Sequence, residues 1–187
     1  MDALHALHSR VSVPRLTGPA PTPRQVEALL QAALRAPDHA WLRPWRFLLL
    51  EQQGLERLGD LFGQVALRNT PDISADVLAR YQGLPLRAPM MIIAIARHVP
   101  HPKVPEAEQD MSCAVAVGNL LLAAHAMGLG AVWRTGEMAA EPLVHDGLGL
   151  AENEKIIAFV YLGQPAGGRK PVPELKPADY LEVWTGN

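Results

Sequence analysis

The chain has 187 residues, of which 49% are hydrophobic and 19% charged, so it can build a sizeable core and is too apolar for a disordered protein. A formal net charge of −2 does not favour nucleic acid or an anionic membrane as a partner, and one cysteine excludes an intrachain disulfide. The first residues lack the basic start and long apolar run of a signal peptide, so we expect a cytoplasmic protein.

Hydrophobic periodicity and the positions of proline and glycine predict about four strands and five or six helices in mixed order. Such an order is typical of an α+β or α/β sandwich, in which several helices pack on one sheet. The expected elements, in chain order, are a short helix at 2–9, a helix from Pro23 to about 35, a loop at 36–45, a buried strand at 46–50, a helix at 54–64, a short helix near 73–81, a central strand at 90–96, a helix from 106 to 127, a strand at 131–133, a short helix at 141–147 and a strand at 155–162.

The helix that ends near Met127 has the most unusual composition. It contains no charged residue between Met111 and Met127, and its apolar residues form no clean stripe, which predicts a helix buried on all sides. Its alanine and glycine content would let another helix pack closely, from the same chain or from a second subunit. Polar interruptions argue against a transmembrane span, and Cys113 is expected to be a small core residue.

Residues 166–187 have a different character from the rest of the chain. They are rich in proline, carry few residues that could form local contacts, and end in the apolar sequence Tyr180 to Trp184. We interpret this segment as an arm, although a frayed terminus would have a similar composition.

The common catalytic motifs are absent from the sequence. Gly128-Leu129-Gly130 lacks the third glycine of a dinucleotide fingerprint and follows a helix instead of a strand. His98 and His101 lack a third metal ligand, so we expect no metal. The remaining candidates supply hydrogen bonds and stacking surfaces but no nucleophile, which favours chemistry carried by a cofactor; they are Arg10, Ser12, Arg35, His39 and Trp133 to Thr135.

Three blocks of sequence, in order, resemble the nitroreductase family of flavin enzymes, and within it the short, single-domain NAD(P)H nitroreductases. The first block is Arg10-x-Ser12-x-x-Arg15, whose composition alone suits a phosphate site but favours a solvated basic terminus. The others are Arg35-Ala36-Pro37 with Pro44-Trp45-Arg46-Phe47, and Gly128-Leu129-Gly130-x-x-Trp133 with Tyr161-Leu162-Gly163-x-Pro165.

The resemblance implies a three-layer α+β sandwich with a central, mostly antiparallel sheet flanked by helices, formed by one FMN-binding domain (1–187). The arm (166–187) would be exchanged within a homodimer that binds FMN at its interface. The residues implied to contact FMN are Arg10, Val11, Ser12, Trp133, Arg134 and Thr135, with Arg35 and His39 from the other subunit. Those implied for the nicotinamide nucleotide are Ala123, Ala124, His125, Ala126, Met127 and Gly128.

The family's reaction would be a ping-pong transfer. NAD(P)H gives a hydride to N5 of FMN, and a nitro compound, quinone or similar acceptor then takes the electrons, so that no protein residue need be catalytic. The same site could serve another flavin reaction, such as reductive dehalogenation, or a non-catalytic dimer that senses or stores flavin or nucleotide. Four positions depart from the family pattern near the flavin: Val11, Asp38, Trp41 and Arg43. Arg169 or Lys170 could add a phosphate contact.

Overall fold

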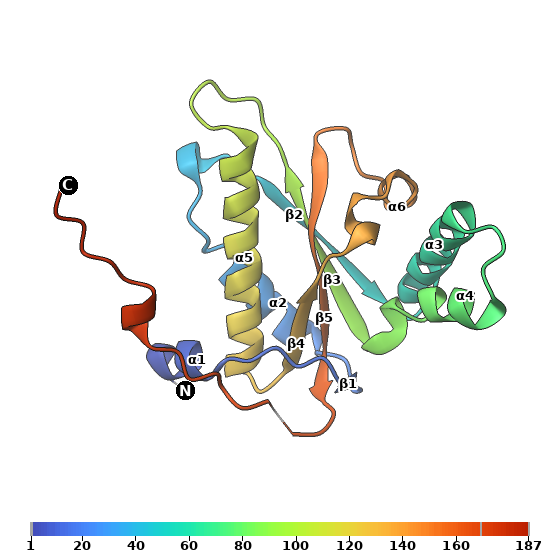
Figure 1. Ribbon diagram of the computed structural model, residues 1–187, viewed down its shortest axis with the longest axis horizontal. Helices are drawn as coiled ribbons and strands as arrows, with labels where there is room; N and C mark the ends of the chain where they lie inside the picture. Colours follow the sequence, from blue (N-terminus) through green and yellow to red (C-terminus); the bar gives the residue numbers. More distant parts are fainter. Residues whose placement is uncertain (1, 169, 187) are drawn as a thin grey trace.

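The computed structural model describes residues 2–168 and 170–186, which form six α-helices, five strands and four short 3-10 turns. Figure 1 shows one compact body from which the C-terminal segment departs. The helices are α1 (Ala3–Ser9), α2 (Pro23–Ala33), α3 (Gln53–Asn69), α4 (Ala75–Gln82), α5 (Glu106–Ala126) and α6 (Pro142–Gly147). The strands are β1 (Leu16–Thr17), β2 (Trp45–Glu51), β3 (Met90–Arg97), β4 (Gly130–Arg134) and β5 (Glu154–Pro165).

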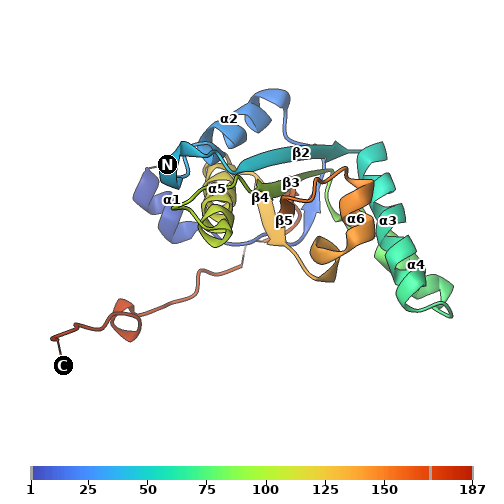
Figure 2. The same ribbon diagram turned by 90° about the horizontal axis from the view of Figure 1, so that it is seen from above.

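The five strands form one antiparallel sheet. Its order is β1-β5-β3-β2, and β4 also pairs with β5. Helices cover both faces, with α2 and α5 on one and α3, α4 and α6 on the other (Figure 2). The predicted α+β fold of three layers is therefore confirmed.

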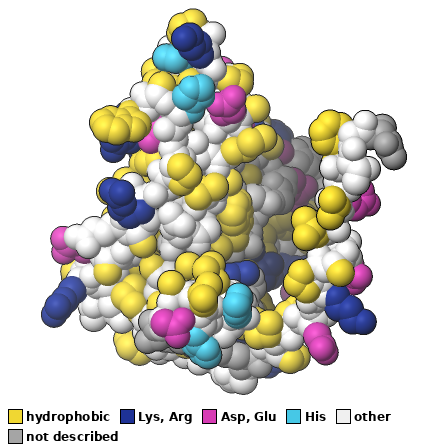
Figure 3. Space-filling model, turned by 90° about the vertical axis from the view of Figure 1, so that its left-hand side faces the viewer, with side chains coloured by type: hydrophobic (Ala, Val, Ile, Leu, Met, Phe, Trp, Pro, Cys, Tyr) yellow, Lys and Arg dark blue, Asp and Glu magenta, His cyan; other side chains and the backbone are white. Residues whose placement is uncertain are grey.

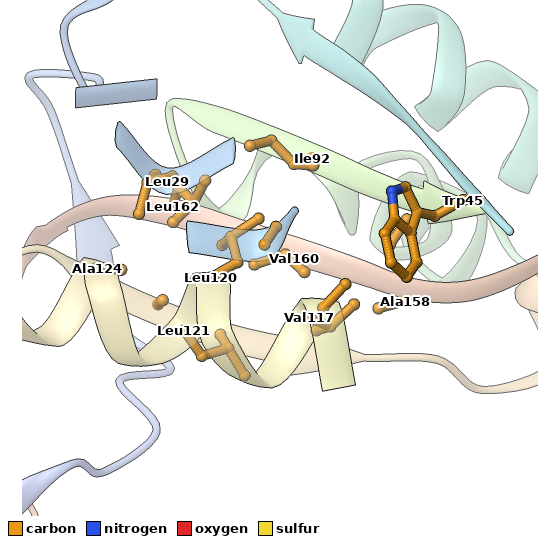
Figure 4. Close-up of a cluster of buried hydrophobic side chains, with 14 of the residues drawn as sticks. Leu29, Trp45, Ile92, Val117, Leu120, Leu121, Ala124, Ala158, Val160 and Leu162 are labelled. Atoms are coloured by element: carbon orange, nitrogen blue, oxygen red, sulfur yellow. The ribbon is translucent and has the colours of Figure 1, made fainter. Parts of the chain in front are cut away.

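Two hydrophobic clusters hold these layers together, and alternation along the strands decides which side chain joins which cluster. Met90, Ile92, Ala94 and Ala96 of β3 face α2 and α5, whereas Met91, Ile93 and Ile95 face α3 and α6. Figure 4 shows the first cluster, in which α5 packs against the sheet. Its labelled members are Leu29, Trp45, Ile92, Val117, Leu120, Leu121, Ala124, Ala158, Val160 and Leu162.

Helix α2 starts with a capping box formed by Thr22 and Gln25. The Thr22 hydroxyl accepts the backbone N–H of Gln25 at 3.3 Å, and the Gln25 side-chain oxygen accepts the N–H of Thr22 at 2.9 Å. These two bonds satisfy amides that the first helical turn leaves free. The helix ends at Ala33, before Pro37.

Three expectations need correction. The strand expected to be buried at 46–50 is the edge strand β2, where only Trp45 and Leu50 are buried, because its outer side has no partner strand. Helix α3 continues past its predicted end at residue 64 and ends at Asn69. Strand β5 runs through Gly163 to Pro165, since β1 and β4 pair with its end.

Helix α5 is also not buried on all sides. Cys113, Ala116 and Leu120 are fully covered by the core, but Met111 is 65% exposed and Val115 is 43% exposed. The exposed positions recur at helical spacing along Met111, Val115, Gly118 and Ala126. On this side of the molecule, hydrophobic side chains lie among polar and charged ones at the surface (Figure 3). No helix among the described residues is long and apolar enough to cross a membrane.

The C-terminal segment makes one 3-10 turn, Pro177–Asp179, and otherwise extends away from the body (Figure 1). Its apolar side chains remain in solvent, with Leu181 73%, Val183 84% and Trp184 86% exposed. This shape agrees with the interpretation as an arm. Exchange of the arm between subunits stays a prediction, because the structure contains a single chain.

Candidate functional site

The N-terminal basic segment lies beside the end of the sheet. It leaves α1 at Arg10 in an extended conformation, and the Val13 N–H then donates to the Ala131 carbonyl of β4 at 2.9 Å. Three residues later, β1 pairs with the end of β5. These bonds fix the backbone, while Arg10 and Val11 are half-buried and Ser12 is exposed. The segment is thus held in place but presents its polar side chains outward.

A small cavity separates this segment from the chain that follows β5. It is lined on one side by Ser12 and Arg15 and on the other by Gly168 and Lys170. The bond from the Ala166 N–H to the Arg15 carbonyl, 2.9 Å long, holds the two sides together. A hydroxyl, a guanidinium and an ammonium group are the donors that a phosphate monoester requires. Arg15 was not among the residues that the sequence implied as FMN contacts. Arg169, which could have added a phosphate contact, lies outside the described residues.

Strand β4 contributes side chains to both faces of the sheet. Trp133 packs against the α2 and α5 cluster, and its indole N–H donates to the Ile157 carbonyl at 3.2 Å. Arg134 points to the other face, where its guanidinium carbon lies 6.0 Å from the centre of the Tyr161 ring. The two side chains therefore cannot line one surface of a flat cofactor together. Arg134 and the exposed Thr135 are the parts of this block that face solvent.

Positive charge near the Tyr161 phenol comes from two arginines. Burial raises the pKa of Tyr161, and the nearby Arg134 and Arg87 guanidinium groups oppose that increase without cancelling it. Neither arginine has an ion-pair partner within residues 2–168 and 170–186, nor do Arg10 and Arg15. No acidic side chain of the described residues therefore pairs with any of these four arginines.

His39 lies far from the Arg10 segment. The His39 Nδ1 atom is 3.0 Å from Glu108 Oε2 near the start of α5, whereas Ser9, next to Arg10, bonds His125 near the end of α5. At 1.5 Å per residue these two anchor points on one helix are about 25 Å apart. Arg35 lines cavities beside α1 and beside the 36–44 loop. One chain therefore does not bring His39 to the Arg10 segment, whereas Arg35 shares a cavity with Ala6, one helical turn before Arg10.

The predicted nicotinamide residues form the last turn of α5 and its cap. Ala124 is fully buried and His125 is 5% exposed, with its Nε2 atom 2.9 Å from the Ser9 hydroxyl. Their side chains face the interior and are not accessible to a nucleotide in this conformation. Only Ala126 and Gly128 are exposed, so a nucleotide could approach this turn only along its outer side.

No group of three His, Cys, Asp or Glu side chains within the described residues has the geometry of a metal site. The structure gives Cys113 no catalytic surroundings either, because its side chain is fully buried. The chemistry that the arrangement supports is the binding of an anionic ligand at the β4 end of the sheet. A cofactor with a phosphate group fits these donors.

Comparison with known proteins gives consistent results. The model of the nitroreductase family matches residues 7–164. The chain is 41% identical to the protein named "Putative NAD(P)H nitroreductase YdjA" of Escherichia coli (strain K12) over 165 residues, which cover 88% of this chain and 89% of that protein.

Solved structures share the fold at lower identity. A nitroreductase-like family protein from Bacillus cereus superposes with a TM-score of 0.80 at 22% identity, covering 98% of this chain and 96% of that one. A protein from Desulfovibrio desulfuricans, described as a "putative nitroreductase in complex with FMN", superposes with a TM-score of 0.71 at 24% identity, covering 98% and 97%.

Proposed function

The chain belongs to the nitroreductase family, and from that premise we propose that it is an FMN-dependent oxidoreductase that takes electrons from NAD(P)H and reduces nitro compounds, quinones or similar acceptors. The observation that carries the proposal is the cavity between Ser12 and Lys170, together with Arg10 and Arg15, which have no acidic partner among the described residues. The overall reaction balances with one NAD(P)H and one proton, which convert a quinone to a hydroquinone or a nitro group to a nitroso group and water.

The residues have distinct roles in this proposal. Ser12, Arg15 and Lys170 would hold the phosphate of FMN. Arg10 and Arg134 would stabilise negative charge on the cofactor. FMN, when bound, supplies the redox centre that exchanges electrons with the nicotinamide and with the acceptor. The protein itself supplies no nucleophile; it holds the cofactor and excludes water above it.

A homodimer explains three further observations. His39 lies too far from Arg10 to share its site within one chain, but a second chain could supply it. The exposed stripe of α5 contains Gly118, and a Cβ atom there would meet nothing within 4 Å. Glycine within a helix costs roughly 0.5–1 kcal/mol relative to alanine, so its presence on an open face favours close approach by another helix. In the dimer, the exposed apolar side chains of the arm would pack against the partner subunit.

The function can be tested with purified protein and added FMN. We expect one FMN per chain, a dimer by sedimentation analysis, and loss of the flavin absorbance when NADH or NADPH is added without oxygen. A panel of nitroaromatic compounds, quinones and halogenated aromatics then identifies the acceptor class. A dimer that binds FMN but is not reduced by either nucleotide would contradict the oxidoreductase function. Protein that takes up no FMN would contradict the whole proposal.

Deletion of residues 171–187 tests the arm. We expect the truncated chain to keep its fold, because none of the described residues 171–186 belongs to a core cluster, but to dissociate at higher protein concentration than the full chain. Equal dimer stability in the two proteins would show that the arm is not part of the interface.

A further inference from the structure

The loop at 36–44 has a strained backbone and exposes an aromatic side chain to solvent. Ala40, Trp41 and Arg43 have φ angles of 61°, 56° and 51°, in the left-handed region that residues other than glycine rarely adopt. Each such residue costs on the order of 1 kcal/mol, and such conformations cluster at functional sites. Helix–strand connections do not need this geometry, so the conformation of the loop requires another explanation.

Two interactions hold the loop in this shape. The Asp38 carboxylate, with its side chain 6% exposed, accepts the Arg43 backbone N–H at 3.2 Å and lies 3.5 Å from Arg43 Nε. His39 joins the loop to α5 through Glu108 at 3.0 Å. The loop is thus fixed on both sides of Trp41, and its conformation is set by the protein before any ligand arrives.

The fixed loop presents an indole and a guanidinium together. Trp41 is 80% exposed, and the Arg43 guanidinium carbon lies 5.5 Å from the centre of its ring. The Nη atoms of Arg43 have no hydrogen-bond partner within the described residues, because Asp38 engages only Nε and the backbone. Both side chains line a cavity of ≈ 490 Å³ together with Leu34, Arg35, Ala36, Pro37 and Asp38.

We propose that Trp41 and Arg43 form a subsite for the electron acceptor, and that the preferred acceptor is an aromatic ring bearing a carboxylate. The indole offers a face for stacking, and the free Nη atoms of Arg43 form a fork that matches a carboxylate. Asp38 does not repel such a ligand, because its carboxylate is buried against Arg43. Arg35 adds a second positive charge to the cavity wall.

The inference rests on the proposed function, since it assigns the acceptor of that reaction. Arg35 and His39 would contact the partner's FMN. His39 belongs to the 36–44 loop, and Arg35 directly precedes this loop. A ring stacked on Trp41 would therefore lie beside that flavin. In this position the group to be reduced would lie next to FMN, and the carboxylate of the acceptor would point toward Arg43.

The test compares 4-nitrobenzoate with its neutral counterpart 4-nitrobenzamide as acceptors for the FMN-loaded protein. We expect a higher kcat/KM for 4-nitrobenzoate. Trp41→Ala should lower that kcat/KM by about fivefold, and Trp41→Phe should restore most of it. Arg43→Gln, which keeps the backbone bond to Asp38, should lower the ratio between the two substrates by about tenfold. Ferricyanide, which has no ring to stack, should lose less of its reduction rate in Trp41→Ala than 4-nitrobenzoate does.

Two further measurements separate the possible failures. Calorimetric binding of benzoate, which cannot be reduced, should weaken in Trp41→Ala even if turnover is slow. Equal kcat/KM for the two nitro compounds in wild type, or unchanged values in Trp41→Ala, would overturn the subsite while ferricyanide reduction left the proposed function intact. Dissociation of Trp41→Ala into monomers would also overturn it, by placing Trp41 in the subunit interface. Failure of wild type to reduce any acceptor would instead contradict the proposed function.

Discussion

The backbone N–H of Val13 donates a 2.9 Å hydrogen bond to the carbonyl oxygen of Ala131 and so joins the N-terminal basic segment to β4. Close packing reinforces this link, because a Cβ atom at Gly130 would lie 2.4 Å from Leu16 Cδ2. Two blocks that are far apart in the sequence therefore share one end of the sheet. Arg10 lies three residues before Val13 on this segment, and this end of the sheet is where we place the phosphate of FMN.

Arg10→Ala should weaken FMN binding about tenfold or more, because it removes a cation that no acidic side chain of the described chain neutralises. The measurement is FMN affinity by fluorescence titration. Arg24→Ala is the matched control, since Arg24 is an exposed arginine at the start of α2. Equal affinities in both variants would remove Arg10 from the proposed site.

Gly118→Leu should convert the dimer into a monomer. The open space around Gly118 accommodates the new side chain within one chain, and the change removes the entropic cost of a helical glycine, so the fold should remain. A partner helix packed against this glycine would clash with it. Sedimentation velocity gives the oligomeric state, and circular dichroism checks the fold.

The control for this variant is Glu56→Leu, which adds an apolar side chain on the exposed side of α3, away from the proposed interface. We expect Glu56→Leu to remain a dimer and to retain FMN, whereas Gly118→Leu should lose both. A dimeric Gly118→Leu protein would show that this face of α5 is not buried between subunits.

The sequence predicted most elements because their signals are local. The capping box at Thr22, the apolar run of β3 and the glycine break after α5 each act within a few residues. Burial was predicted less well, because it depends on neighbours. Helix α5 shows no stripe in the sequence because both of its faces are apolar, although only one packs on the core of its own chain.

The candidate site was harder to predict for the same reason. Arg15 and Lys170 meet only because β1 pairs with the end of β5, and this register cannot be read from either segment alone. The bond between His39 and Glu108 likewise depends on how a loop lies against α5. The family resemblance supplied Arg10 and Ser12, whereas the cavity beside Ser12 became visible only in the folded chain.

Cys113 should behave as a core residue and not as a nucleophile. Burial, and secondarily the charge of Asp110, raise the pKa of its thiol to about 12, so almost no thiolate exists at neutral pH. We expect no reaction with Ellman's reagent at pH 8 in the folded protein and complete reaction in denaturant. Cys113→Ala should keep full reductase activity; rapid labelling of the folded protein would contradict the prediction.

Glu154→Gln should lower the stability of the protein at neutral pH by about 1–2 kcal/mol. Glu154 accepts two bonds from Arg46, at 2.6 and 2.7 Å, and one from the Ala151 N–H at 3.0 Å. The hydrogen bonds from Arg46 hold the pKa of Glu154 below its ordinary value of 4.5, despite the opposing effect of burial. A carboxylate with a lowered pKa stabilises the fold above pH 4.5, and that stabilisation is lost as the pH falls through the folded-state pKa.

The difference in unfolding free energy between wild type and Glu154→Gln should therefore be largest near pH 7 and shrink as the pH falls below 4.5. Urea unfolding at several pH values measures it. Glu152→Gln provides the control, because Glu152 is exposed and, unlike Glu154, accepts no hydrogen bond from Arg46. A constant difference for Glu154→Gln across this range would mean that packing, and not the ionised carboxylate, accounts for its contribution.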